Sequence, residues 1–349
     1  MKRLYAAALV AILILAPVYA AAQTNANTKA TKDAKNTKAL PRMPWGHPDL
    51  QGVWDYRSIT PLQRPAQYGD RAFLTEEEAR NLEQSAEDLD ASSDAAPARP
   101  AKAGENVGAY NRFWLDFGTR TVNDRRTSLI TDPPTGRFPE MTAAGAAEAK
   151  LRMPFGADLP ISSYEDLGLG DRCRNTRGVP ILPGAYNNNV HVFQTQDYVA
   201  INVEWFHIWR IIPLDGRPHG AIRQWVGDSR GHWEGDTLVV ETTNFQGLVS
   251  NIGSGRGIRK LVERFTRVSP EAVRYEFTVD DPVRFVRPWS AALTLWQSDG
   301  KVYEFACHEG NYAIVNILNG ALAPDAKPAA DAKPGALCID CEARENVAR

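Results

Sequence analysis

Hydrophobic and polar residues alternate along the chain from about residue 190 onward. Because neighbouring side chains of a strand point to opposite faces, this period of two predicts β-strands. No helical period interrupts the series. The alternating segments cover residues 190–196, 198–212, 221–227, 232–245, 261–268, 273–279, 290–297 and 301–309.

Short turn signals separate several of these segments. Four hairpins in succession predict an antiparallel up-and-down meander, and a meander of this many strands closes on itself to remove its unpaired edges. The expected fold class is therefore mainly β, an antiparallel barrel with side chains or a ligand inside. The turn signals are Gln196-Asp197, Glu234-Gly235, Ser269-Pro270-Glu271 and Asp299-Gly300.

The first half of the chain predicts only a few short helices. Thr75 and Glu78 have the spacing of a capping box, which begins a helix that we expect to end near Leu89. Thr142 caps a second short helix that runs through about Met153.

The two ends of the chain differ in composition from the middle. Residues 23–42 and 321–349 are rich in small and polar residues and contain near-repeats, so we expect both to be disordered. Residues 43–320 are long enough for one barrel domain, with a helical and loop insertion at about 75–185.

The first residues have the pattern of a cleavable export signal. Lys2 and Arg3 precede an apolar run at residues 4–18, and three alanines stand before Gln23. The run is shorter than the roughly 20 apolar residues that span a membrane. The sequence therefore predicts a signal peptide at residues 1–22, a periplasmic or secreted protein and no stable membrane insertion.

Charge and motifs exclude several classes of function. The chain has 40 basic and 42 acidic residues and no basic stripe, so we expect no nucleic-acid partner. It also has no glycine-rich phosphate-binding motif, so no nucleotide cofactor, and indeed no cofactor of any kind, is expected. A small-molecule ligand or substrate is the expected partner.

Four cysteines suggest disulfides in an oxidising compartment. We expect a local pair, Cys338 with Cys341, and a long-range pair, Cys173 with Cys307. The C-x-x-C spacing also fits a redox motif or half of a zinc site. No second pair of ligands accompanies it, so the structural disulfides are preferred.

Two resemblances add to this picture. Gly52-Val53-Trp54 opens the first apolar segment and resembles the G-x-W that begins the first strand of lipocalin-type barrels. Four longer stretches, which span much of residues 43–320, resemble an uncharacterised family of secreted bacterial proteins, and that resemblance implies export but no activity. The stretches are HPDLQGVWDY, RIIPLDGRPH, GDSRGHWEGDTLVVETTNF and YEFACHEGNY.

His207 is the leading candidate for chemistry. If residues 199–211 form one regular strand, it is the only ionisable group on a face that is otherwise apolar. Two interpretations stay open: a core histidine that hydrogen-bonds to backbone, or a general acid or base in an apolar cavity. The face comprises Val199, Ile201, Val203, Trp205, His207, Trp209 and Ile211.

Carboxylates are the expected catalytic partners of this histidine. Glu309 and Glu263 fall between apolar positions of their strands and are predicted to reach the cavity. Glu204 and Arg210 lie on the opposite face of a regular strand, so Glu204 needs a bulge to join the site.

Aromatic and polar side chains near these groups are candidates for ligand binding. We expect the polar side chains to bind a carboxylate or a sugar at the mouth of the barrel. The histidine spacings match no metal motif, so no metal is expected, although His191, His207 and His308 from separate strands remain an alternative. The binding candidates are Trp205, Trp209, Arg210, His308, Asn189 and Tyr186.

Three functions fit these patterns. The first is an exported, cofactor-independent lyase, isomerase or hydratase that uses His207 and a carboxylate for acid–base chemistry. The second is a lipocalin-like carrier for an apolar or aromatic ligand, and the third is a structural envelope protein with a filled barrel. The first is favoured because an ionisable group on an apolar, buried face is typical of a functional site.

Overall fold

The computed structural model describes residues 39–95, 115–151, 161, 163–167, 170, 172–174, 178–246 and 258–321. Residues 1–41 and residues 42–349 form two units, and every element below belongs to the second unit. The predicted signal peptide, the predicted Cys338–Cys341 pair and most of the two predicted disordered ends lie outside the described residues.

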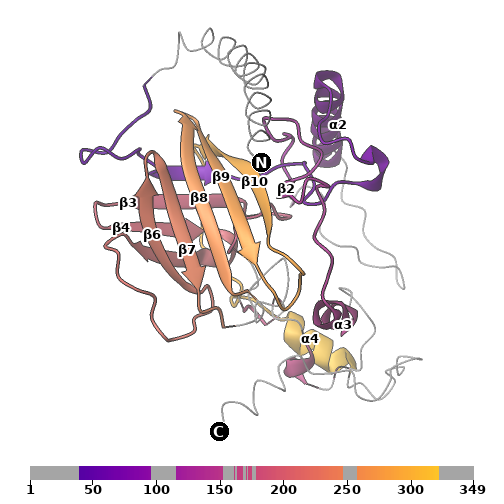
Figure 1. Ribbon diagram of the computed structural model, residues 1–349. Helices are drawn as coiled ribbons and strands as arrows, with labels where there is room; N and C mark the ends of the chain where they lie inside the picture. The colour runs from indigo at the N-terminus through magenta and orange to yellow at the C-terminus, as the bar shows by residue number, and fades with distance from the viewer. Residues whose placement is uncertain are drawn as a thin grey trace, which may run out of the picture. The chain divides into compact units, whose positions relative to one another are not determined.

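Ten strands form one sheet that curls into a nearly closed barrel, with β6 to β9 in front and β1, β3 and β4 behind them (Figure 1). The order is β5-β4-β3-β1-β10-β9-β8-β7-β6, and β2 pairs with β10. All pairings are antiparallel. Since β1 lies between β10 and β3, the long strands follow chain order around the barrel, which confirms the predicted up-and-down barrel. The strands are β1 (Gly52–Asp55), β2 (Ile130–Asp132), β3 (Asn189–Gln194), β4 (Tyr198–Val203), β5 (Ile208–Pro213), β6 (Asp228–Glu234), β7 (Thr237–Thr243), β8 (Lys260–Ser269), β9 (Ala272–Asp280) and β10 (Trp289–Ser298).

Both predicted helix caps form. Thr75 Oγ1 accepts from the Glu78 amide at 3.1 Å, and the Glu78 carboxylate accepts from the Thr75 amide at 2.8 Å. Thr142 Oγ1 accepts from the Gly145 amide at 3.0 Å. The first helix runs beyond the predicted Leu89, whereas the predicted end of the second lies outside the described residues. The helices are α2 (Glu76–Ala95), α3 (Ala143–Leu151) and α4 (Ala313–Ala321), and the 3-10 turns are η1 (Ala66–Tyr68), η3 (Tyr164–Asp166) and η4 (Trp205–His207).

The segment predicted as one long strand, residues 198–212, is instead a hairpin. β4 ends at Val203, β5 begins at Ile208, and these two residues face each other as cross-strand partners. Phe206 and His207 turn the chain with φ values of 57° and 53°. Such values are uncommon outside glycine, and no glycine or proline marks the place, so the sequence pattern contains no turn signal.

Two other predicted strands are also wrong. Residues 301–309, all of them described, belong to no strand, because β10 already pairs with β9 on one side and with β1 on the other. Residues 221–227 lie in the loop between β5 and β6, where Gln224 makes one isolated bridge to Phe245. The short β2 strand was not predicted.

The barrel has a seam between β5 and β6. In an antiparallel series of nine strands, the first strand, β5, and the last strand, β6, run in the same direction. Within the described residues, no hydrogen-bonded ladder joins these two strands. Side chains close the seam instead. A Cβ added at Gly231 of β6 would lie 2.7 Å from Leu214 Cδ2 and 2.9 Å from Ile212 Cγ2, so glycine lets these two residues approach the β6 backbone.

We predict that Gly231→Val destabilises the protein by about 1–3 kcal/mol, because the added methyl groups overpack the seam. Urea denaturation followed by tryptophan fluorescence measures the change. Gly170→Val is the matched control, since no described residue lies within 4 Å of a Cβ at that position. Equal stability of the two variants would show that the seam tolerates a side chain.

Candidate functional site

An N-terminal strap, residues 42–50, crosses one end of the barrel. Arg42 forms a two-bond ion pair with Asp236 in the β6–β7 turn, with N–O distances of 2.9 and 2.6 Å. The ring of His47 stacks on Trp233 with centroids 4.5 Å apart. The amide of Leu50 donates to the side chain of Gln194 at 2.9 Å. The strap is therefore fixed to β3, β6 and the turn after β6.

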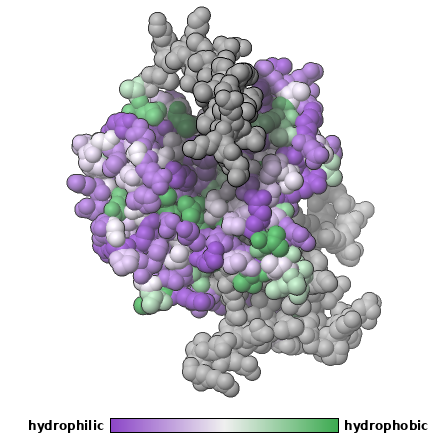
Figure 2. Space-filling model, in the orientation of Figure 1, coloured by the Kyte–Doolittle hydropathy of each residue, from purple (hydrophilic) through white to green (hydrophobic). Residues whose placement is uncertain are grey.

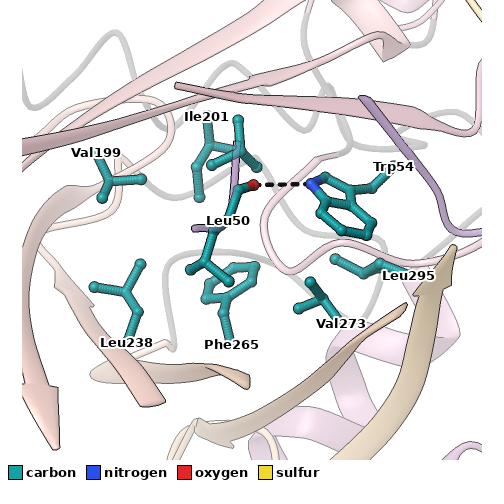
Figure 3. Close-up of a pocket in the computed structure, with 9 residues that line it drawn as sticks. Leu50, Trp54, Val199, Ile201, Leu238, Phe265, Val273 and Leu295 are labelled. Atoms are coloured by element: carbon teal, nitrogen blue, oxygen red, sulfur yellow. Dashed lines mark hydrogen bonds between the residues drawn. The ribbon is translucent and has the colours of Figure 1, made fainter. Parts of the chain in front are cut away.

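Leu50 fills the interior at this end (Figure 3). Its side chain is 2% exposed and points between apolar side chains from both walls, while its carbonyl accepts a hydrogen bond from Trp54 Nε1 at 2.9 Å. The space that remains is about 10 Å³, near the minimum for one water molecule. Its lining is Leu50, Trp54, Val192, Val199, Ile201, Leu238, Phe265, Val273 and Leu295.

Residues 178–184 pack into the barrel beside the β4–β5 turn. Val179 and Ile181 are 2% and 0% exposed and belong to the core. Gly178 lies so close to Ile208 that an added Cβ would be 2.9 Å from its Cδ1 atom. Like the strap, this segment therefore fills part of the barrel interior with apolar side chains.

A buried ion pair crosses the barrel interior. The guanidinium of Arg210 donates two hydrogen bonds to the Glu263 carboxylate, at 2.5 and 3.0 Å, and the two side chains are 1% and 0% exposed. Tyr275 donates its hydroxyl proton to the same carboxylate at 2.7 Å and accepts from the Ile181 amide at 3.0 Å. The network thus ties β5, β8, β9 and residues 178–184 together.

Burial and charge set the ionisation of this network. Burial lowers the pKa of Arg210, but the attraction of Glu263 outweighs it, so the pKa lies above its usual value. Burial, followed by the charge of Glu263, raises the pKa of Tyr275 well above its usual value. The tyrosine is therefore a neutral donor, and Glu263 is engaged in an ion pair.

The predicted catalytic group does not assemble. His207 is exposed in the β4–β5 turn, and Glu309 is exposed in the segment after β10, whereas Glu263 is inside the barrel. Arg210, predicted on the outer face, is also inside. The reason is the hairpin. Because Val203 pairs with Ile208, the inward-facing residues have odd numbers in β4 and even numbers in β5. The prediction that these residues share one cavity is therefore wrong.

Glu204 has a local structural partner. It is 5% exposed, and its carboxylate accepts from the amide and the side-chain amide of Asn189, at 3.2 and 2.8 Å. The pair fixes the turn against the start of β3. The turn changes the direction of the Glu204 side chain, as the expected bulge would have done. The carboxylate points toward Asn189, however, and not toward His207.

An aromatic cluster forms at the same turn. Trp205 contacts Tyr186 and Phe305 at centroid distances of 4.5 and 5.5 Å, and Phe206 stacks on Phe305 at 4.5 Å. The disulfide between Cys173 and Cys307, which confirms the long-range pair expected from the sequence, lies two residues beyond Phe305. His308 follows and is exposed.

A second aromatic surface lies outside the barrel. The register places two rows of three side chains on the outer face of β3, β4 and β5, while their neighbours Val192, Ile201 and Ile212 point into the core. We call these six residues the aromatic face. They are His191, Asn202 and Trp209 in one row and Phe193, Ala200 and Ile211 in the next.

The rings of the aromatic face touch one another. The centroids of His191 and Phe193 are 4.0 Å apart, and Phe193 stacks on Trp209 at 5.7 Å across the small Ala200. His207 approaches the edge of Trp209 at 6.0 Å. Two of the predicted site residues, Trp209 and His207, are thus neighbours on an exposed surface and not in a cavity.

Sequence reasoning missed a polar cluster on the outside of β6. The Asp228 carboxylate accepts from the Gly220 amide at 2.7 Å and from Arg230 at 2.5 Å, and it lies 3.3 Å from Nδ1 of His219. Asn244 donates to the carbonyl of Gly220. These contacts hold the loop after β5 against β6. The resemblance stretches 210–219 and 227–245 meet here, which is the one signal that could have found the cluster.

An open groove of about 620 Å³ lies near residues 58–62, 117–118 and 183–185. None of the predicted site residues lines it, and its lining contains no ionisable side chain. Within the described residues, no three ligand-type side chains are close enough to hold a metal ion, and no helix is long and apolar enough to cross a membrane.

We predict that Glu263→Leu destabilises the protein by about 3–5 kcal/mol, because Arg210 is left buried without its counter-ion. The double variant Arg210→Met with Glu263→Leu has neither charge, so we expect it to regain most of that loss. Urea unfolding measures both. A double variant as unstable as the single one would mean that the loss comes from packing and not from the unpaired charge.

No protein-family model, no curated protein and no solved structure matches this chain. The resemblance to secreted bacterial proteins therefore stays a prediction.

Proposed function

We propose that the protein is an exported binding protein that holds its ligand on the aromatic face, outside the barrel. The observation that carries this proposal is the contrast between the two candidate places. The interior space beside Leu50 is about 10 Å³, whereas Trp209, Ile211 and Phe193 on the outside are 46%, 58% and 40% exposed.

The arrangement of the exposed side chains supports binding. Single exposed apolar residues are normal on a protein surface, whereas a contiguous group marks an interaction site. On the side of the molecule shown in Figure 2, over β6 to β8, hydrophilic residues dominate and the hydrophobic ones are scattered. On the aromatic face of β3, β4 and β5, the ring of Phe193 contacts the rings of both His191 and Trp209.

Binding fits the geometry better than acid–base catalysis. The acid–base mechanism expected from the sequence pairs His207 with a carboxylate within hydrogen-bond reach of the histidine or of its substrate. Glu263 is bound to Arg210, and Glu204 is bound to Asn189. In contrast, stacking on Trp209 and Phe193 needs only the exposed rings that are present.

Export is part of the proposal. The basic residues, the apolar run and the three alanines before Gln23 support it, and so does the Cys173–Cys307 disulfide, because such bonds persist in oxidising compartments.

We predict that Trp209→Ala weakens binding of a neutral aromatic dye, N-phenyl-1-naphthylamine, by about fivefold or more, since an aromatic contact contributes about 1 kcal/mol. Phe193→Ala acts in the same direction. Dye fluorescence in a titration measures the affinity. Phe73→Ala is the matched control, because Phe73 is 57% exposed but lies outside the aromatic face.

The Leu50→Ala variant separates this proposal from an interior carrier. It enlarges the space of about 10 Å³ in the barrel interior, and Leu50 is not part of the aromatic face. We expect its dye affinity to equal that of the wild type. Dye binding that increases in Leu50→Ala and ignores Trp209→Ala would place the ligand inside and contradict the proposal.

We also predict that the full chain, expressed in a Gram-negative bacterium, is cleaved before Gln23 and recovered from the periplasm with Cys173 and Cys307 oxidised. Intact-mass measurement before and after reduction reports both features. A chain with Leu9→Arg and Leu13→Arg, which breaks the apolar run, is the control and should stay uncleaved. An uncleaved wild-type chain in the cytoplasm would refute export.

A further inference from the structure

We propose that the ligand of the aromatic face is a neutral oligosaccharide. This inference rests on the proposed function and names the class of ligand. Three properties of the surface carry it: its lack of charge, its open shape and a buried amide group between its rings.

The first property is the absence of charge. None of the six residues of the aromatic face is an acid, a lysine or an arginine. Burial lowers the pKa of His191, which favours its uncharged form at neutral pH. An ionic ligand would find no counter-ion within the face, so a neutral ligand fits it better.

The second property is shape. The two rows lie side by side on the outside of a sheet, and neither the 10 Å³ space nor the 620 Å³ groove includes any of their residues. A small apolar ligand usually needs a concave site that buries most of its surface. An open face instead suits an extended ligand that presents one flat side to several rings in succession.

The third property is an unpaired donor. Asn202 is 2% exposed, stands between His191 and Trp209 in its row, and its Nδ2 group has no hydrogen-bond partner among the described residues. Burial of such a group without a partner is unfavourable, because its hydrogen bonds to water are lost and not replaced. Trp209 is 46% exposed, so its ring has room to move and let a ligand oxygen accept from Asn202.

A sugar ring matches all three properties. It has no charge, one face of it is rich in C–H groups that pack on aromatic rings, and its hydroxyl and ring oxygens accept hydrogen bonds. A lipid chain has no acceptor for the amide along its length. An aromatic hydrocarbon stacks on the rings but has no oxygen or nitrogen atom that accepts from Asn202.

The test measures binding of neutral hexasaccharides to the full mature chain by isothermal titration calorimetry. The probes are the β-1,4-glucose, α-1,4-glucose, β-1,4-mannose and β-1,4-N-acetylglucosamine hexamers. We expect at least one to bind in the micromolar to millimolar range. Trp209→Ala should weaken that binding at least tenfold, Trp209→Phe should restore part of it, and Phe73→Ala should leave it unchanged.

Asn202→Leu is the variant specific to this inference, because it removes the amide and keeps the rings. We expect it to weaken saccharide binding about fivefold or more while dye binding stays within twofold of the wild type. A thermal melt confirms that the variant is folded. If it does not fold, Asn202→Asp replaces it, since the carboxylate keeps the size but cannot donate.

The outcomes separate the two proposals. If no neutral hexasaccharide binds at 5 mM while the dye binds in a manner that depends on Trp209, the saccharide inference is wrong and the binding function stands. If neither binds, both are wrong. Binding of acidic but not neutral saccharides, with no effect of Asn202→Leu, also overturns the inference.

Discussion

One cross-strand pair, Val203 with Ile208, decides what is inside and what is outside this barrel. Paired residues of an antiparallel ladder point to the same side, so an inward Val203 requires an inward Ile208. Every second residue of β5 then follows. Arg210 enters the core, where it needs Glu263, and Trp209 turns to solvent, where it meets Phe193. The ion pair and the aromatic face are two results of the same register.

Much of the fold could be predicted because its signals are local. Alternation of apolar and polar residues located most of the long strands, and the hydroxyl–carboxylate spacing of Thr75 and Glu78 located the start of α2. Up-and-down order followed from the hairpin turns. The Cys173–Cys307 bond was expected from the compartment and from the closeness of the other two cysteines along the chain.

The site was harder to predict, for two physical reasons. Residues 204–207 reverse the chain without glycine or proline, and a slip of one position exchanges the two faces of a strand, so Trp209 and Arg210 were placed on the wrong sides. Residues 301–309 alternate like a strand, yet both sides of β10 are already occupied. Whether a strand edge is free to pair depends on the whole sheet, so the sequence of residues 301–309 alone cannot show it.

The seam between β5 and β6 has a consequence for how the molecule can be divided. Strands β1 to β5 form one wall and strands β6 to β10 form the other. Within the described residues, the two walls share hydrogen-bonded ladders only on the side of β10, which pairs with β1 and β2. At the seam, the side chains of Ile212 and Leu214 pack against the backbone at Gly231. A chain cut in the loop between these walls would therefore yield two halves whose recombination rebuilds the ladders of β10, a natural basis for a split reporter.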